Sequence, residues 1–136
     1  MSFVLDASVS ACWAFADESH PAAGAAFSRI QAADAVVPAL WWFEIRNILI
    51  VNERRGRISE QDTGLFLRAV AQFRIRIDRS PEQADVLSMA RVHSLSVYDA
   101  AYLELARREK LSLATLDRHL AAAARSAGIP LVGAGG

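Results

Sequence analysis

The sequence predicts one α/β domain, a three-layer α/β/α sandwich built around a central parallel sheet. Short apolar segments typical of buried strands alternate with helical segments along the chain, and this order favours a parallel sheet with helices on both faces. A length of 136 residues suits one domain with a full core. Because no repeat or linker divides the chain, we expect residues 1–132 to form the domain and the glycine-rich residues 133–136 a flexible tail.

The strands are predicted from brief apolar runs. Runs of this length between turn or helix signals are typical of strands buried in a parallel sheet. The predicted strands cover residues 2–5, 35–37, 75–77, 111–116 and 130–132.

The helices are predicted from their start and stop signals. Pro21 suits the first turn of a helix, and Gly56 and Gly128 suit positions just past a helix end. Ser59 and Asp62 have the spacing of a capping box. The predicted helices cover residues 8–16, a segment from 21, then 39–55, 59–73, a segment from 80, 96–108 and 118–127.

Composition limits the setting of the protein. The longest uncharged apolar run, residues 35–43, is far short of the ~18 residues of a membrane span, and no signal peptide is expected because Asp6 interrupts the N-terminal segment. Cys12 is the only cysteine, which excludes an internal disulfide and favours a reducing, cytoplasmic location with Cys12 in the core. Hydrophobic residues make up 53% of the chain, so we expect some apolar surface for a partner.

Two acids directly follow predicted strands. Asp6 comes after residues 2–5, and Asp117 comes after residues 111–116. Ligands of α/β sheets bind outside the carboxyl ends of the strands, so both acids should lie at one edge. The alternative for each of them is an ordinary helix N-cap.

Glu44 interrupts an apolar helix face. On the predicted helix 39–55 it shares a face with Leu40, Trp41, Ile48 and Val51. An acid on such a face needs a partner, because a buried unpaired charge is costly. Asn47 is one turn away and is a candidate to share a site; a salt bridge to an arginine such as Arg46 is the alternative.

Asp99 fits two patterns. It lies three residues after Ser96, in the acidic position of a capping box. It also lies on a face with Leu95, Tyr102 and Leu103, which is otherwise apolar. Capping and a functional role are compatible, because a helix can begin at the edge of the sheet.

The acids together indicate a divalent metal site. Four carboxylates at one edge would repel each other, and a hard cation such as Mg²⁺ or Mn²⁺, which prefers oxygen ligands, removes that conflict. The histidines His20, His93 and His119 lack zinc-like spacing and are interpreted as surface residues. The sequence contains neither a glycine-rich phosphate loop nor a nucleophile elbow.

Four segments in chain order carry a resemblance to a known family. They are Asp6-Ala7-Ser8-Val9, Glu44-Ile45-Arg46-Asn47, Tyr98-Asp99-Ala100-Ala101-Tyr102-Leu103-Glu104-Leu105-Ala106 and Thr115-Leu116-Asp117. Together they resemble the PIN-domain ribonucleases, and in particular the VapC toxins of bacterial toxin–antitoxin pairs. The resemblance spans Asp6 to about Val132, and the third segment followed by Thr-x-Asp is its most specific part.

The resemblance implies a PIN-like fold, a metal-dependent endoribonuclease and roles for individual residues. It assigns Asp6, Asp99, Glu44 and Asp117 to the metal-binding and catalytic site, and it assigns supporting roles to Ser8, Asn47 and Thr115. Relatives typically form homodimers and are inhibited by a cognate VapB-like antitoxin. Many also carry a further acid after the fourth segment, where this chain has Arg118 and His119, so occupancy of a second metal site is left open.

Substrate and partner contacts are predicted less directly. Net charge is zero, so RNA binding must use local patches, and Arg54, Arg55 and Arg57 form the densest basic cluster. The alternative for this cluster is a solvated helix end. Trp13, Trp41 and Trp42 are interpreted as core or interface residues, with Trp41 pointing inward and Trp42 outward, toward a dimer partner or an antitoxin helix.

Two other functions stay open at this point. A phospho-receiver-like signalling module also has an acidic Mg²⁺ pocket, but it needs a lysine at the site, and Lys110 precedes its strand. A PIN-like interaction module without catalysis is the second alternative, although all four acids are present.

Overall fold

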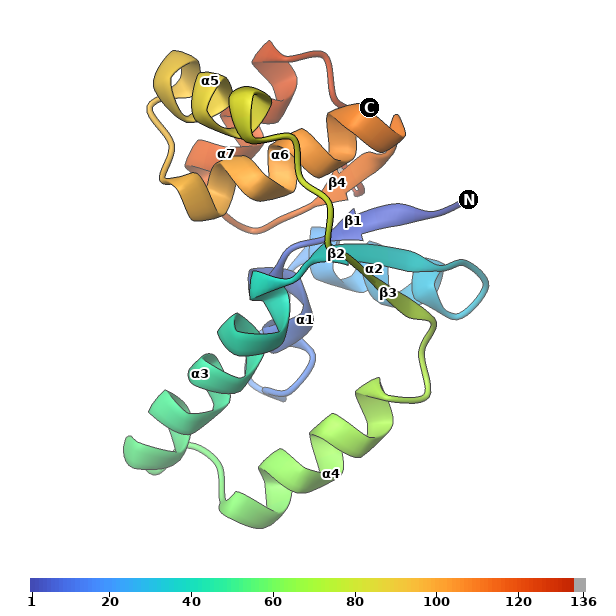
Figure 1. Cartoon of the computed structure of the whole chain (residues 1–136). Coiled ribbons are helices and arrows are strands. Elements are labelled where there is room, and N and C mark those ends of the chain that lie inside the picture. The colour runs from blue at the N-terminus through green and yellow to red at the C-terminus, as the bar shows by residue number, and fades with distance from the viewer. Residues whose placement is uncertain (134–136) are drawn as a thin grey trace.

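The computed structural model describes residues 1–133 and confirms the predicted fold class (Figure 1). Its strands are β1 (Phe3–Leu5), β2 (Ala35–Pro38), β3 (Ile75–Asp78) and β4 (Ser112–Ala114). Its helices are α1 (Ala7–Cys12), α2 (Pro21–Ile30), α3 (Leu40–Arg54), α4 (Glu60–Val70), α5 (Gln83–His93), α6 (Val97–Glu109) and α7 (Arg118–Ser126). The strands form one sheet in the order β3-β2-β1-β4, and every pairing is parallel.

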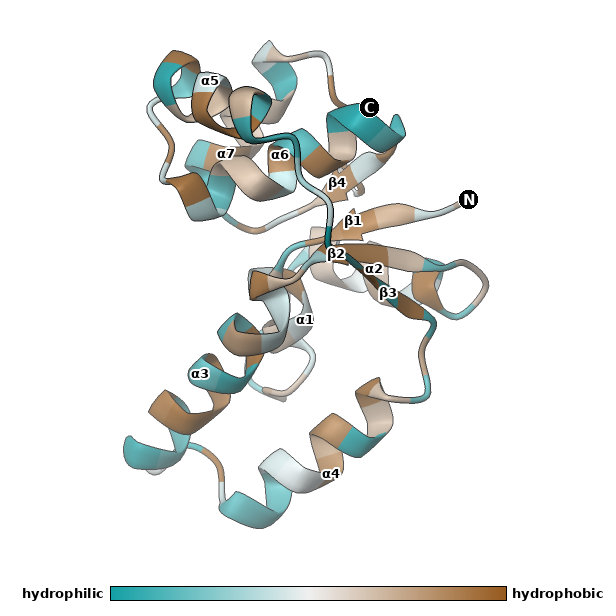
Figure 2. Cartoon of the chain, viewed as in Figure 1, coloured by the Kyte–Doolittle hydropathy of each residue, from teal (hydrophilic) through white to brown (hydrophobic). Residues whose placement is uncertain are grey.

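Helices cover both faces of this sheet. The helices α5, α6 and α7 lie on one face, and α1 to α4 lie on the other (Figure 1). The central strands β1 and β2 are buried and hydrophobic along their whole length (Figure 2), as expected for a parallel sheet between two helix layers. The described part of the chain has no helix that is both long enough and apolar enough to span a bilayer.

The strand order creates a switch point beside β1. The chain passes from β1 to β2 and β3 on one side, and it later adds β4 on the other side of β1. The two strand ends at this point are joined where Asp6 N donates to Ala114 O at 3.0 Å. Open α/β sheets bind ligands outside the carboxyl ends of the strands at such a point, so the topology singles out the ends of β1 and β4.

Some predicted element bounds were wrong. Helix α1 ends at Cys12 rather than residue 16, because the chain continues in single turns, with Ala14 N and Phe15 N donating to carbonyls three residues earlier. Residues 130–132 do not form a full strand, because only Leu131 makes a bridge to Leu113 of β4. Strand β4 is also shorter than the predicted 111–116.

The predicted tail lies mostly outside the described residues, which end at Gly133. Gly133 itself has a φ of +74° and lies against α2, where a Cβ atom would collide with the backbone of Ala22. Glycine is the residue that tolerates both this backbone conformation and this close approach. The chain is therefore held against α2 as far as Gly133.

Candidate active site

Asp6 lies at the end of β1 and is buried, with 6% of its surface exposed. Ser8 Oγ and Thr115 Oγ1 donate hydrogen bonds to the same carboxylate oxygen, Asp6 Oδ2, at 2.8 and 2.7 Å. The two hydroxyls in turn accept hydrogen bonds from Leu116 N and Asp117 N, both at 3.0 Å. This network fixes Asp6 against the loop that follows β4, and no hydrogen bond within residues 1–133 reaches Asp6 Oδ1.

The surroundings of Asp6 oppose its negative charge. Burial raises the pKa of the Asp6 carboxyl, and the charges of Asp99 and Asp117 raise it further, whereas the hydrogen bonds from Thr115 and Ser8 lower it. Burial and neighbouring negative charge both disfavour a carboxylate. Asp6 is therefore an oriented acid that a cation would stabilise in its charged form.

Asp117 is both an N-cap and a member of this group of acids. Its Oδ1 accepts hydrogen bonds from His119 N at 2.8 Å and Leu120 N at 3.0 Å, which caps α7. The cap that the sequence offered as an alternative is therefore present. Because both bonds go to one oxygen, Oδ2 stays without a hydrogen bond from the described groups.

Asp99 lies in the first turn of α6, but its carboxylate does not complete a capping box. Ser96 Oγ accepts a hydrogen bond from Asp99 N at 3.0 Å, and no return bond from Ser96 N to the carboxylate occurs in the described residues. Burial raises the pKa of the Asp99 carboxyl and the charge of Asp117 raises it further, while Ser96 and His119 lower it. The cap uses the Asp99 backbone, so its side chain is available to the acid group.

Glu44 pairs with a tyrosine, and the predicted alternative of a salt bridge to Arg46 is wrong. Tyr102 OH donates to Glu44 Oε1 at 2.5 Å, and Arg46 instead donates to Trp42 O at 3.1 Å. Burial raises the pKa of Glu44, the Tyr102 hydrogen bond lowers it, and the charges of Asp6 and Asp99 raise it. The acid therefore faces the same group as Asp6 and Asp99.

The buried face of α3 is rotated from the predicted one. Its fully buried residues are Trp41, Ile45, Leu49 and Asn52, and Glu44 lies at the border of this face, only partly buried. Asn47 is exposed, and no hydrogen bond of the described residues connects its side chain to the acids. A position at the border gives Glu44 both a buried partner and access to the sheet edge.

The three arginines of the predicted basic cluster, Arg54, Arg55 and Arg57, have different surroundings in the structure. Arg57 is bound internally: it donates to Asn52 Oδ1 at 2.8 Å and forms ion pairs with Asp17 and Glu18, both at 3.1 Å. Arg54 and Arg55 are exposed at the end of α3. The free positive charge of the cluster is therefore that of these two residues.

The donor set of the acid group fits a hard divalent cation. All its donors are carboxylate oxygens, and burial, together with their mutual repulsion, raises the pKa values of Asp6, Glu44 and Asp99. Within residues 1–133, three ligand atoms lie within 4.8 Å of one another only at Cys12, Glu18 and His20, so the acids do not form a group this close.

Comparison with known proteins identifies the family. The model of the PIN domain family matches residues 3–132, nearly the whole described chain. The chain belongs to the PIN-domain family. Ribonuclease VapC3 from Pyrobaculum aerophilum is 32% identical over 124 residues, which cover 89% of this chain and 93% of that protein. The crystal structure of PAE2754 from the same organism matches with a TM-score of 0.71 at 24% identity, covering 90% of this chain and 84% of the other.

Two buried polar residues of this PIN domain were missed by sequence reasoning. Tyr102 was assigned to an apolar face, although it is the hydrogen-bond partner of Glu44. Glu104 is 2% exposed and pairs with Arg108 at 2.6 Å, and Arg108 also pairs with Asp78 at 2.7 Å. The spacing of Glu104 and Arg108, four residues apart on one helix, was the available signal.

Proposed function

We propose that this PIN domain is an Mg²⁺- or Mn²⁺-dependent endoribonuclease that hydrolyses RNA phosphodiester bonds and acts as the toxin of a toxin–antitoxin pair. The observation that carries the proposal is Asp6 at the switch point of the sheet, oriented through Oδ2 by Ser8 and Thr115 and surrounded by further acids. The ribonuclease name of the VapC3 relative supports the same reaction.

The metal would be held by carboxylate oxygens that the fold leaves free. Asp6 Oδ1 and Asp117 Oδ2 carry no hydrogen bonds from described groups, and Asp99 adds a third carboxylate at the start of α6. When bound, Mg²⁺ or Mn²⁺ lowers the pKa of a coordinated water and neutralises charge on the phosphate. Ser8 and Thr115 keep Asp6 in one orientation for this role.

Glu44 is the proposed general base. Tyr102 orients it through Oε1, and burial raises its pKa, which favours proton acceptance. Asp117 is less suited to this role, because its Oδ1 is committed to the cap of α7. The oxygen of the attacking water forms the new bond to phosphorus, and Glu44 takes the proton from this water. The bond to the leaving ribose oxygen breaks, and that oxygen takes up a proton from solvent.

Two predicted contacts remain part of the proposal. Arg54 and Arg55, exposed at the end of α3, are proposed to contact the RNA backbone. Asn47 is proposed to support the site, as the family resemblance implies, and its exposed side chain is accessible to a ligand. A cytoplasmic location belongs to the same proposal and rests on the free, buried thiol of Cys12.

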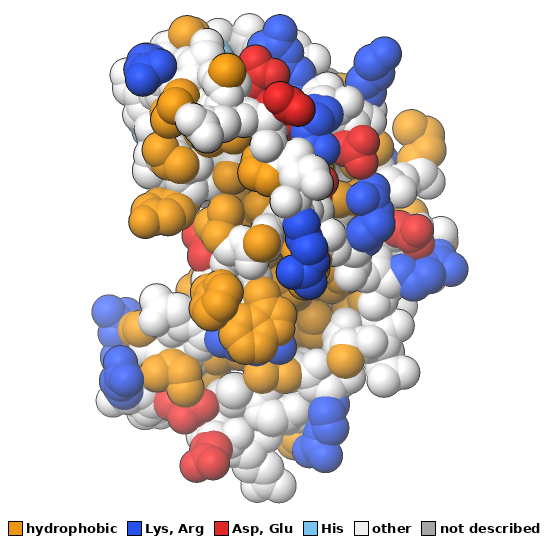
Figure 3. Space-filling view, in the orientation of Figure 1, with side chains coloured by type: hydrophobic (Ala, Val, Ile, Leu, Met, Phe, Trp, Pro, Cys, Tyr) orange, Lys and Arg blue, Asp and Glu red, His pale blue; other side chains and the backbone are white. Residues whose placement is uncertain are grey.

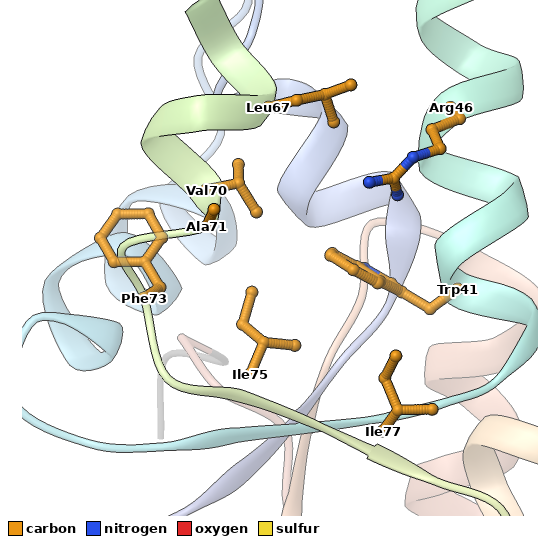
Figure 4. A pocket seen from close by; sticks show the side chains of 8 residues that line it. All are labelled: Trp41, Arg46, Leu67, Val70, Ala71, Phe73, Ile75 and Ile77. Atoms are coloured by element: carbon orange, nitrogen blue, oxygen red, sulfur yellow. The ribbon is translucent and has the colours of Figure 1, made fainter.

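An antitoxin helix is proposed to bind between α3 and α4. An apolar cavity of about 180 Å³ lies there, and Figure 4 shows its walls formed by Trp41 from α3 and by Leu67, Val70 and Ile75. Arg46 reaches toward the same cavity (Figure 4). Hydrophobic side chains also gather over the start of α3 (Figure 3), where the exposed residues are Trp42 and Phe43. An apolar groove of this kind suits an amphipathic helix.

A homodimer is proposed as well, through a different surface. Val92, Val97 and Tyr98 are exposed around the turn between α5 and α6, with exposed fractions of 72%, 50% and 67%. Exposed apolar clusters of this kind are typical of protein interfaces.

The phospho-receiver alternative is disfavoured by the position of Lys110. This lysine ends α6 just before β4 begins, so it lies at the amino edge of the sheet, opposite the acids. The other alternative, a PIN-like interaction module without catalysis, differs from the proposed enzyme only in lacking RNA cleavage, so an activity assay distinguishes the two.

Cleavage of RNA by the purified protein tests the proposal. Cleavage should require Mg²⁺ or Mn²⁺, stop in EDTA and be lost in Asp6→Asn, with circular dichroism confirming that the variant folds. Cleavage that persists in excess chelator, or that the variant retains at the wild-type rate, would refute metal-dependent catalysis at this site. Sequencing RNA ends from cells after brief induction then identifies the target.

A further inference from the structure

An apolar cavity lies beside the acids at the carboxyl edge of the sheet. It has a volume of about 370 Å³, within the size range of small-molecule sites. Its apolar walls come from the end of β2, the start of α3, the loop after β3 and the middle of α6: Pro38, Ala39, Leu40, Pro81 and Ala101. The proposed mechanism does not use this cavity.

The strand order places the cavity one strand away from Asp6, at the same edge of the sheet. Val4 pairs with Val36 in the β1–β2 ladder, and Asp6 and Pro38 each lie two residues further along, at the carboxyl ends of these neighbouring strands. Pro38 in turn pairs with Asp78 of β3. Neighbouring strands are about 4.8 Å apart, so the ends of β2 and β3, which line the cavity, lie one and two strand spacings from the end of β1.

Helix α3 also connects the cavity to the acid group. Leu40 in the cavity wall is one turn before Glu44 on the same helix face. Ala101 in the cavity wall is in the turn of α6 that also carries Asp99 and Tyr102. The cavity and the acids Glu44 and Asp99 are therefore built on the same two helices at the same edge of the sheet.

Charges around the cavity suit a nucleotide rather than a cation. The one acid in its wall, Asp78, is neutralised by Arg108, which pairs with it at 2.7 Å. Arg79 lies in the same lining, is exposed and forms no ion pair within residues 1–133. An apolar slot with a free guanidinium beside it matches a flat base attached to a phosphate.

We propose that this cavity binds one nucleobase of the RNA, on a nucleotide next to the scissile phosphate, and so helps to choose the cleavage site. The proposal rests on the ribonuclease function proposed above. Metal and acids recognise only the phosphate, which is the same at every position, so selection of a site requires contacts to bases. Ala101 and Arg79 are the residues that set the shape and charge of this subsite.

Two substrates test the subsite separately from the chemistry. One is an RNA oligonucleotide with a mapped cleavage site, and the other is methyl 4-nitrophenyl phosphate, a diester without a base. Ala101→Leu narrows the cavity and Arg79→Ala removes the free charge. For each variant, kcat/KM on RNA should fall about tenfold or more relative to kcat/KM on the small diester, the scale expected when a docked base is lost.

Abasic oligonucleotides identify the docked base. A single abasic nucleotide next to the cleavage site should reduce wild-type cleavage about as much as Ala101→Leu does, and the variant should add little further loss on that abasic RNA. Arg125→Ala is the matched charge control, because Arg125 is exposed in the last turn of α7, two turns from Asp117. Arg125→Ala should change neither kcat/KM on the RNA nor kcat/KM on the small diester. If Ala101→Leu does not fold, the exposed Arg79→Ala variant provides the same comparison.

The outcomes distinguish the two proposals. Equal losses of kcat/KM on the RNA and on the small diester would overturn the base subsite. Wild-type cleavage that is not reduced by an abasic nucleotide at any flanking position would overturn it as well. Neither result would contradict the ribonuclease function. Loss of partner-protein binding with unchanged RNA cleavage would also overturn the base subsite and assign the cavity to docking. A wild-type protein that hydrolyses neither substrate would overturn the ribonuclease itself.

Discussion

The Tyr102 hydroxyl donates a 2.5 Å hydrogen bond to Glu44 Oε1 and thereby joins α6 to α3 at the carboxyl edge of the sheet. Burial raises the pKa of Tyr102 far above its ordinary value, so this hydroxyl remains a donor. The bond also favours the charged form of Glu44, against burial and the charges of Asp6 and Asp99. One buried tyrosine therefore orients the Glu44 carboxylate and opposes the rise of its pKa.

Tyr102→Phe removes this bond while keeping the ring in the core. We expect the free energy of unfolding to fall by about 1.5 kcal/mol, the scale of a hydrogen bond to a charged group. The pKa of Glu44 should rise without its donor, so the acidic limb of the pH profile for RNA cleavage should move to higher pH. Urea denaturation and a pH–rate series measure the two effects. The control is Tyr98→Phe, an exposed tyrosine one turn earlier; an identical pH profile for Tyr102→Phe and wild type would contradict the base role of Glu44.

Thr115→Val removes one of the two hydroxyl donors to Asp6 without changing the shape of the side chain. Outer hydrogen-bond partners of metal ligands typically contribute about 10–100-fold in affinity, so Mg²⁺ affinity should fall on this scale. The pKa of Asp6 should also rise, and higher pH should restore part of the binding. Isothermal titration calorimetry with Mg²⁺ at two pH values provides the measurement. Thr63→Val, which removes a hydroxyl bonded to Glu53 on the far end of α3, should leave metal affinity as it is.

Asp99→Asn separates metal binding from helix capping. The cap uses Asp99 N, which the substitution retains, so stability in EDTA should hold or rise as repulsion from Asp117 is relieved. RNA cleavage in Mg²⁺ should be lost. Ser96→Ala is the complementary variant: it removes the cap, should cost about 1 kcal/mol of stability and should keep cleavage. A destabilised Asp99→Asn protein that cleaves at the wild-type rate would reduce Asp99 to a structural residue.

Stability of the metal-free protein should depend on pH through Asp6. The folded-state pKa of Asp6 is raised above its ordinary value of 3.8, so the native state keeps a proton that the unfolded chain loses. Stability from this group is therefore present near pH 4 and below, and it is lost as pH rises through the folded pKa. In EDTA, the difference in melting temperature, Asp6→Asn minus wild type, should increase as the pH is raised. Saturating Mg²⁺ should reverse this difference by binding only the wild type.

The exposed aromatic residues of α3 predict that the protein binds a partner protein. Trp42 is 43% and Phe43 is 69% exposed, and the guanidinium of Arg46 lies 3.7 Å from the centre of the Trp42 ring. Purified protein should run as a dimer or with a small protein partner in light scattering after gel filtration. Phe43→Ser should weaken the partner complex, whereas Val92→Ser on α5 should weaken the homodimer. A strictly monomeric wild type at high concentration, soluble without any partner, would speak against both interfaces.

The sequence located the end of β1 correctly, and it located the end of β4 and the helix faces less well. Asp6 directly follows β1 as expected, since a polar residue after an apolar run marks the point where a buried strand reaches solvent, but β4 ends at Ala114, so Asp117 lies three residues past its strand. The face of Glu44 was misjudged, because the apolar pattern of α3 is broad and the buried stripe of Trp41, Ile45 and Leu49 is only one of two that it allows. Contacts with the rest of the fold decide between them.

Hydrogen-bond partners distant in the chain were beyond sequence reasoning. Thr115 and Asp6 are 109 residues apart, and Tyr102 and Glu44 are 58 residues apart. The alternative partner for Glu44, Arg46, was chosen for its nearness in sequence, and it is turned toward Trp42 instead. Similarly, Arg57 belonged to a basic cluster in the sequence but is held by Asp17 and Glu18 in the fold.

By itself, the sequence determined the class of the fold and the chemistry available at its edge, because hydrophobic periodicity and the type of residue after each strand are local properties of the chain. Only the tertiary structure decided which oxygen of Asp6 is bound and which is free, which partner orients Glu44, and that Pro38, Leu40 and Ala101 line one apolar cavity. These relationships depend on the parallel register of β1, β2 and β4, and that register is set by packing the whole sheet between two layers of helices.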